Sequence, residues 1–104
     1  MAEVCLQRWD ARDGPVTERR MMLLLEYEGY EVASYTYREG TVFPEHRHAQ
    51  AKCDGVLEGK LRITVGDSVF ELGPGDRLYL PADTPHSAEV VGAKTVFSLD
   101  GTLW

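Results

Sequence analysis

An all-β fold, a small sandwich or barrel, is the class that this sequence predicts. The apolar stretches are short, about 4 to 8 residues, and rich in β-branched and aromatic residues. Glycine-containing turn signals separate these stretches at short intervals, and no long window keeps the 3.6-residue period of an amphipathic helix. Both features are typical of sandwiches and barrels. The length of 104 residues predicts a single domain, residues 1–104.

The N-terminal segment, residues 1–15, predicts one edge strand. Residues 4–9 are the strand candidate, and the turn signal Asp-Gly-Pro follows at residues 13–15. Residues 1–6 lack a charged region followed by an apolar region, so no secretory signal is visible. We therefore expect a cytoplasmic protein.

The stretch after this segment fits two kinds of element. Residues 19–27 contain five consecutive apolar residues and suit a helix as well as a strand. The pair Glu28-Gly29 has the composition of a hairpin turn into residues 30–37, which are rich in β-formers. Because a hairpin needs a strand on both sides, the sequence favours a strand over residues 20–27.

Further glycine turns divide the rest of the chain into short strands. Within residues 60–65, apolar and polar residues alternate, which places Leu61, Ile63 and Val65 on one face. The strands expected here are residues 41–44, 60–65, 68–72 and 77–80, and a last hairpin pairs residues 88–91 with residues 94–99.

Three histidines, the only ones in the chain, form a candidate metal site. His46 and His48 are two residues apart, so on a strand they share a face, about 7 Å apart at the backbone. Two such imidazoles are able to converge on one divalent ion at a bond length of about 2.1 Å. His86 is the candidate for a third ligand from a neighbouring strand, which leaves other positions open to water or substrate.

The three histidines lie within two longer patterns that also contain glycine and proline at fixed spacings. They are Gly40-x5-His46-x-His48-x3-Lys52-x6-Gly59 and Gly75-x5-Pro81-x-Asp83-x2-His86-x3-Val90. They resemble the two cupin motifs, G-x5-H-x-H-x(3,4)-E-x6-G and G-x5-P-x-G-x2-H-x3-N, and cover residues 40–90. The resemblance implies a double-stranded β-helix, or jelly roll, often dimeric, with a metal at the mouth of the barrel. It also implies that the three histidines occupy the metal-ligand positions.

The chain departs from the cupin pattern at the position of the usual glutamate ligand. Lys52 stands there, or Cys53 if the looser spacing applies. Asp83 and Val90 replace the glycine and asparagine of the second motif. A protonated lysine has no acceptor for a cation, so the motif residues offer a three-histidine site. An ammonium about 4 Å from a divalent ion is repelled by roughly 8 kcal/mol at an effective dielectric near 20. We therefore expect Lys52 to point outward into solvent.

The cysteines have a simple interpretation. Cys5 and Cys53 lie far apart and form no Cys-x-x-Cys motif, so two reduced thiols are expected, although a bridge between them stays open. For Cys53, a small buried hydrophobe competes with a metal ligand or a redox-sensitive thiol.

Charge and length restrict the partners. The net charge is −6 with no basic stripe, which argues against nucleic acid and anionic membranes. The apolar run of residues 21–25 is too short to cross a bilayer. It offers more apolar surface than one strand face buries, so we expect a homodimer that uses this run and residues 1–15.

Two classes of function remain open. One is a metal-dependent enzyme, a dioxygenase or isomerase, that acts on a small organic substrate with Fe, Mn, Ni, Zn or Cu, since imidazole ligands do not choose among these ions. The alternative is a non-catalytic module that binds or senses a small molecule without a metal. No catalytic residue is assigned.

Overall fold

Residues 3–104 are described by the computed structural model, and they form nine strands, one α-helix and one 3-10 helix. Residues 1 and 2 of the expected edge segment lie outside this range. The elements in order are β1 (Cys5–Gln7), η1 (Ala11–Asp13), α1 (Glu18–Tyr27), β2 (Glu31–Tyr37), β3 (Val42–His46), β4 (Ala51–Glu58), β5 (Leu61–Val65), β6 (Ser68–Leu72), β7 (Arg77–Leu80), β8 (His86–Val90) and β9 (Val96–Leu103).

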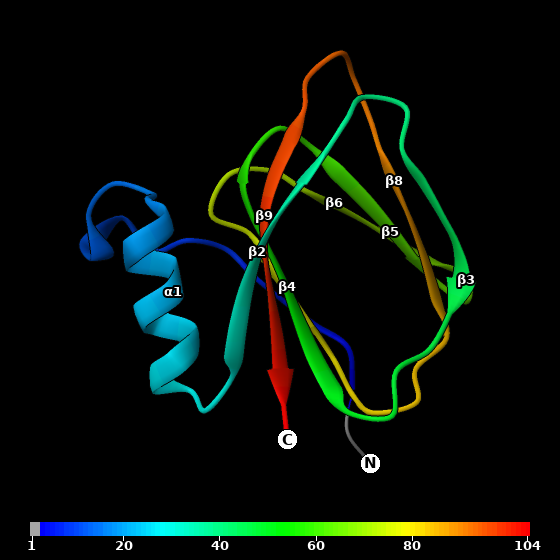
Figure 1. Ribbon diagram of the computed structural model, residues 1–104, viewed down its shortest axis with the longest axis horizontal. Helices are drawn as coiled ribbons and strands as arrows, with labels where there is room; N and C mark the ends of the chain where they lie inside the picture. Colours follow the sequence, from blue (N-terminus) through cyan, green and yellow to red (C-terminus); the bar gives the residue numbers. More distant parts are fainter. Residues whose placement is uncertain (1–2) are drawn as a thin grey trace.

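The strands form two antiparallel sheets. The first sheet has the order β1-β7-β4-β9-β2 and the second has the order β3-β8-β5-β6. From β2 onward, every connection except the β5–β6 hairpin passes from one sheet to the other. The chain therefore winds the two sheets together as a double-stranded β-helix, or jelly roll, which confirms the predicted all-β class. Figure 1 shows α1 on one side of β2, β4 and β9, and β3 and β8 on the other.

The main core lies between the two sheets, where strand side chains alternate between the interior and the outside. Ile63 and Leu78 are completely buried there, one from each sheet. Full burial of one such side chain contributes about 1.5 to 3 kcal/mol. The buried members of this core are Val56, Leu61, Ile63, Leu72, Leu78, Leu80, Val90 and Val96.

The strand predicted over residues 20–27 is wrong, because α1 occupies this stretch. Thr17 caps the helix, since its Oγ1 accepts a hydrogen bond from the backbone N–H of Arg20 at 3.1 Å. Met21 and Leu25 are four residues apart and completely buried, whereas Leu23 between them is 53% exposed. The expected hairpin turn is the C-terminal end of this helix, where Gly29 has a φ of 100°.

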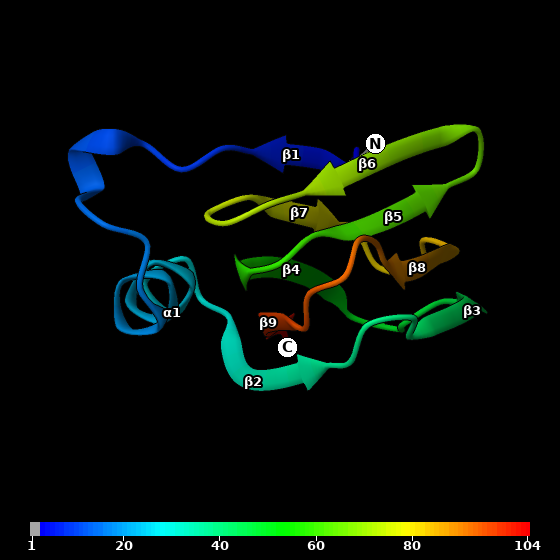
Figure 2. The ribbon, with the colours of Figure 1, turned by 90° about the horizontal axis from the view of Figure 1, so that it is seen from above.

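Helix α1 covers the outer face of the first sheet, as Figure 2 shows from above. Met21 and Leu25 pack there in one cluster with Cys53 and Leu99. Gly55 of β4 makes this approach possible, because a Cβ at that position would stand 2.5 Å from the Met21 Sδ. The two ends of the apolar run therefore lie inside the protein, and Met21 and Leu25 offer no surface to a partner chain.

The remaining predictions have mixed outcomes. The edge strand expected at residues 4–9 is confirmed in shorter form as β1, which pairs only with β7. The last hairpin is wrong, because β8 pairs with β3 and β5 whereas β9 pairs with β2 and β4. Cys5 and Cys53 are both free thiols. Within residues 3–104, no helix is long and apolar enough to cross a membrane.

Candidate metal centre

Two of the three histidines face each other across a pair of strands. His46 is the last residue of β3, His86 is the first of β8, and the two are register partners. His48 lies in the loop beyond β3, so the expected shared strand face does not apply to it. A backbone hydrogen bond of 2.7 Å from the Asp83 N–H to the His48 carbonyl joins this loop to the one before β8. Asp83 has a φ of 59°, the left-handed conformation that glycine adopts most readily.

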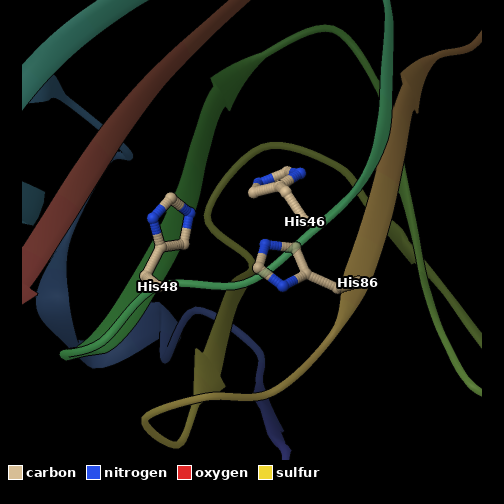
Figure 3. Close-up of side chains that lie close together, drawn as sticks. All are labelled: His46, His48 and His86. Carbon is tan, nitrogen blue, oxygen red and sulfur yellow. The ribbon is translucent and has the colours of Figure 1, made fainter.

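The three rings converge on one region, as Figure 3 shows. The His46 ring centroid lies 4.9 Å from that of His48 and 4.4 Å from that of His86, and the remaining pair is 5.6 Å apart. One ligand atom from each residue lies within 4.8 Å of the others. Two ligands of one ion at about 2.1 Å each are at most about 4.2 Å apart. Small ring rotations therefore bring these donors within reach of a single ion.

Backbone carbonyl groups set the orientation of two of these rings. The Nδ1 of His46 is 2.8 Å from the carbonyl oxygen of Pro44, and the Nδ1 of His86 is 2.8 Å from that of Thr84. A carbonyl only accepts, so in each neutral ring Nδ1 carries the hydrogen and donates it. The lone pair then resides on Nε2, which is the tautomer that metal-binding histidines use when their other nitrogen donates to a carbonyl.

Burial keeps the imidazole rings of His48 and His86 neutral. Burial lowers the pKa of His86, and the nearby charges of His46 and Lys52 lower it further, while the bond to Thr84 opposes the shift. Burial likewise lowers the pKa of His48, followed by the charge of Lys52 and the other two histidines. Neutral imidazole is the form that binds a metal ion. The donor set therefore fits a divalent transition metal.

The histidines open onto a cavity of about 240 Å³ inside the barrel. This volume is at the low end for ligand sites, which suits a small organic molecule. One wall is aromatic and apolar, and two carboxyl groups lie among the lining residues. The lining residues are Tyr35, Tyr37, Phe43, His46, His48, Asp54, Leu61, His86, Ala88 and Asp100.

The outward position expected for Lys52 is wrong. Its side chain is buried, with 9% of the residue exposed. The Nζ donates to Asp100 Oδ2 at 2.8 Å and to Thr102 Oγ1 at 2.7 Å. Asp100 supplies a counter-charge, and burial of an ammonium is tolerable when it is paired and hydrogen-bonded. Lys52 therefore stands beside the histidines as one half of an ion pair.

Cys53 is separate from the candidate site. It alternates with Lys52 along β4 and packs under α1 with Met21 and Leu99. Burial raises the pKa of its thiol, so the group stays protonated. This environment supports Cys53 as a small buried hydrophobe and not as a metal ligand or a redox-sensitive thiol.

Two acidic residues of the cavity were not found from the sequence. Asp54 shares the inner face of β4 with Lys52, a relation that period-two alternation along the strand would have revealed. Asp100 comes from β9 and is the register partner of Asp54. No local signal in the sequence connects residues that are 46 positions apart.

Comparisons with known proteins agree with this geometry. The family described as "Cupin domain" matches residues 33–100. No curated protein compared with the sequence is similar enough to count as a relative.

Solved structures share the fold. A protein of Thermus thermophilus, TT1209, is 28% identical with a TM-score of 0.61, over 67% of this chain and 68% of that one. A Streptococcus pyogenes protein of unknown function, SPY1581, is 17% identical with a TM-score of 0.64, over 72% of this chain and 64% of that one. The DMSP lyase DddQ of Ruegeria pomeroyi is 24% identical with a TM-score of 0.62, over 70% of this chain but only 38% of the lyase. At these identities, the last two show the fold alone.

Proposed function

The chain belongs to the cupin domain family, and on that basis we propose that it is a small metal-binding cupin that acts on a small organic molecule. His46, His48 and His86 would hold one divalent ion, which is Fe, Mn, Ni, Zn or Cu. The observation that carries the proposal is the convergence of three imidazoles, two of them oriented by backbone carbonyls. The cavity beside them supplies the space for the ligand.

The chemistry we propose is isomerase- or dioxygenase-like. A bound divalent ion would act as a Lewis acid and polarise an oxygen atom of the ligand. Three histidine ligands leave coordination positions free for such an oxygen. Tyr35, Tyr37 and Phe43 form an apolar wall that excludes water and positions the carbon skeleton. Asp54 and Asp100 place polar groups beside that skeleton.

Metal binding is tested on protein purified without an affinity tag. Elemental analysis, followed by calorimetric titration with Zn²⁺, is expected to give one ion per chain. His46→Ala, His48→Ala and His86→Ala each remove a ligand and are expected to lower the affinity at least tenfold. Arg47→Ala is the matched control, because this exposed residue lies between two of the ligands. Unchanged affinity in the histidine variants would contradict the proposal.

A second candidate function is a metal-free module that binds a small molecule. It is favoured by the position of Lys52, whose charge acts on His48 and opposes a cation there. The two functions differ in what removal of one histidine does to a bound organic ligand. In the metal-free case, a ligand identified by thermal shift keeps its affinity in His86→Ala and in the presence of a chelator.

A further inference from the structure

The inner face of the barrel holds two carboxyl groups against one ammonium. Asp54 and Asp100 are direct register partners on β4 and β9, and both line the cavity. Lys52, at the neighbouring inward position, forms its ion pair with Asp100. Like charges directly opposite each other on adjacent strands are destabilising. One negative charge therefore lacks a partner unless a proton or a ligand neutralises it.

The other groups around this pair do not supply that positive charge. Tyr37 approaches from β2, and burial raises the pKa of its hydroxyl, so it is uncharged. Burial lowers the pKa of His48 and of His86, so neither ring supplies a positive charge at neutral pH. In the part of the chain that the structure describes, Lys52 is the one cation that acts on Asp54.

The electrostatic environment of Asp54 also favours a proton on this carboxyl group. Burial raises the pKa of Asp54, the adjacent Asp100 raises it further, and the attraction of Lys52 only partly offsets these effects. Asp54 also faces the cavity that the three histidines share. A proton held there is within the space that a ligand would occupy.

We propose that Asp54 gains and loses a proton near neutral pH. It is then the acid–base residue through which the cavity exchanges protons with a ligand bound at the histidines. Its role toward a ligand rests on the proposed function, whereas its protonation does not. Asp100 and Lys52 are positioning residues that keep a single proton on the pair.

This assignment favours isomerisation over oxygenation. The O–H bond of Asp54 breaks and the carboxylate keeps its electron pair, while the hydrogen binds one atom of a double bond in the ligand, whose π electron pair forms the new bond. A neighbouring ligand atom then returns a proton to that carboxylate, and the electron pair of the broken ligand bond moves into the new double bond. Atoms, charge and electrons balance, and no oxidant is needed.

The protonation state is tested by NMR on protein carrying ¹³C-carboxyl-labelled aspartate. We expect one aspartate to titrate near pH 7, about three pH units above the ordinary value of about 3.9. That resonance should be absent in Asp54→Asn and in Asp54→Glu, of which the second keeps an acid at the position. Asp67→Asn, in the exposed β5–β6 turn, is the matched control and should leave that resonance in place. If every aspartate of the parent titrates near 4, the proposal is wrong.

Proton exchange with a bound ion is tested by calorimetry with Zn²⁺ alone. Titrations near pH 7 in two buffers of different ionisation enthalpy give the number of protons released per ion. We expect the parent to release up to one proton more than Asp54→Asn, because the positive ion displaces the proton of Asp54. Equal release would overturn the acid–base role. If Zn²⁺ does not bind at all, the proposed function fails, while the NMR titration still decides the state of Asp54.

Discussion

The ammonium group of Lys52 lies inside the barrel because Asp100 and Thr102 both accept hydrogen bonds from it. The expectation of a solvent-directed side chain was based on the repulsion between the ammonium and a divalent ion. A buried ion pair is stable only when its hydrogen bonds are satisfied, and loss of one partner costs about 3 to 5 kcal/mol. The acceptors are 48 and 50 residues away in the sequence, so no local pattern revealed them.

Lys52→Glu tests this arrangement and the motif register together. A carboxylate at this position adds a metal ligand, and we expect the affinity for Zn²⁺ to rise at least tenfold, which is about 1.4 kcal/mol. The same change sets a third carboxyl beside Asp54 and Asp100. We therefore expect the metal-free variant to lose about 3 to 5 kcal/mol of unfolding free energy. Calorimetry and urea unfolding measure the two effects.

Lys60→Glu is the control for the charge change, because Lys60 is exposed. It should alter the free energy of Zn²⁺ binding and the free energy of unfolding by less than about 0.5 kcal/mol each. A Lys52→Glu variant that binds Zn²⁺ no better than the parent would show that position 52 does not reach the ion.

Asp83 occupies a backbone conformation that explains the glycine of the second cupin motif. Its φ of 59° is unfavourable for most side chains, although aspartate tolerates it better than others. We expect Asp83→Ala to lower the unfolding free energy by about 1 kcal/mol and Asp83→Gly to leave it unchanged or slightly raised. Urea unfolding at neutral pH distinguishes them. Equal losses in both variants would mean that the aspartate side chain, and not the φ angle, matters at this position.

The candidate site was predictable in part. The histidines follow from their spacing and from the turn residues that frame them, because these are local properties of the chain. Asp54 could have been found from its spacing of two from Lys52, whereas Asp100 and the ion pair of Lys52 depend on the pairing of β4 with β9. Pairing between distant strands is a tertiary property, so it left no signal in the sequence.

At the level of elements, α1 shows the limit of local pattern. Its apolar run lacks the interruptions that mark an amphipathic helix, and the following Glu-Gly pair suits a helix end as well as a hairpin. The packing of Met21 against Gly55, with Leu25 buried in the same cluster, decides between them. The all-β class was nevertheless predictable, because turn signals recur throughout the remaining chain.

Substitutions on the buried face of α1 should lower the unfolding free energy more than substitutions on its exposed face. We expect Met21→Ala to lower the unfolding free energy by about 2 to 5 kcal/mol, because it empties a completely buried position. Leu23→Ala, at a position that is 53% exposed, should cost less than about 1 kcal/mol. Urea unfolding of both variants measures the difference. Similar losses would indicate that Leu23 is buried in solution by a partner chain.

At the scale of the whole molecule, the homodimer stays a prediction, but the residues expected at its interface are different. The buried part of α1 offers no interface, but several large apolar residues remain exposed, namely Leu23, Tyr27, Phe97, Leu103 and Trp104. Light scattering at micromolar concentration should give about twice 11.7 kDa. Tyr27→Glu combined with Trp104→Glu should shift the equilibrium towards monomer. Val69→Glu, also at an exposed apolar position, is the control. A monomeric parent would end the prediction.

An ion at the histidines would bind two connections between the sheets to each other. His46 ends β3 and His48 lies in the crossing from β3 to β4, whereas His86 follows the crossing from β7 to β8. Binding to the folded state alone at 100 times the dissociation constant adds about 2.7 kcal/mol. For a domain of this size, each kcal/mol raises the melting temperature by roughly 4 to 8 °C. We therefore expect Zn²⁺ to raise it by about 10 °C or more at pH 7.5, and not at all in His86→Ala.

The rise in melting temperature that Zn²⁺ produces should become smaller as the pH falls. The pKa values of His48 and His86 lie below the ordinary 6.5 in the folded protein, so below pH 6.5 the unfolded chain binds more protons. The contribution of these two histidines to the stability of the metal-free protein should therefore be lost as the pH falls from about 6.5 through these lowered values. It is measured in Asp54→Asn, because the raised pKa of Asp54 contributes in the opposite direction in the parent. Protonation also competes with Zn²⁺, so the thermal shift should shrink in the same range. A shift that stays constant from pH 7.5 to pH 5 would mean that the ion is bound by groups other than these histidines.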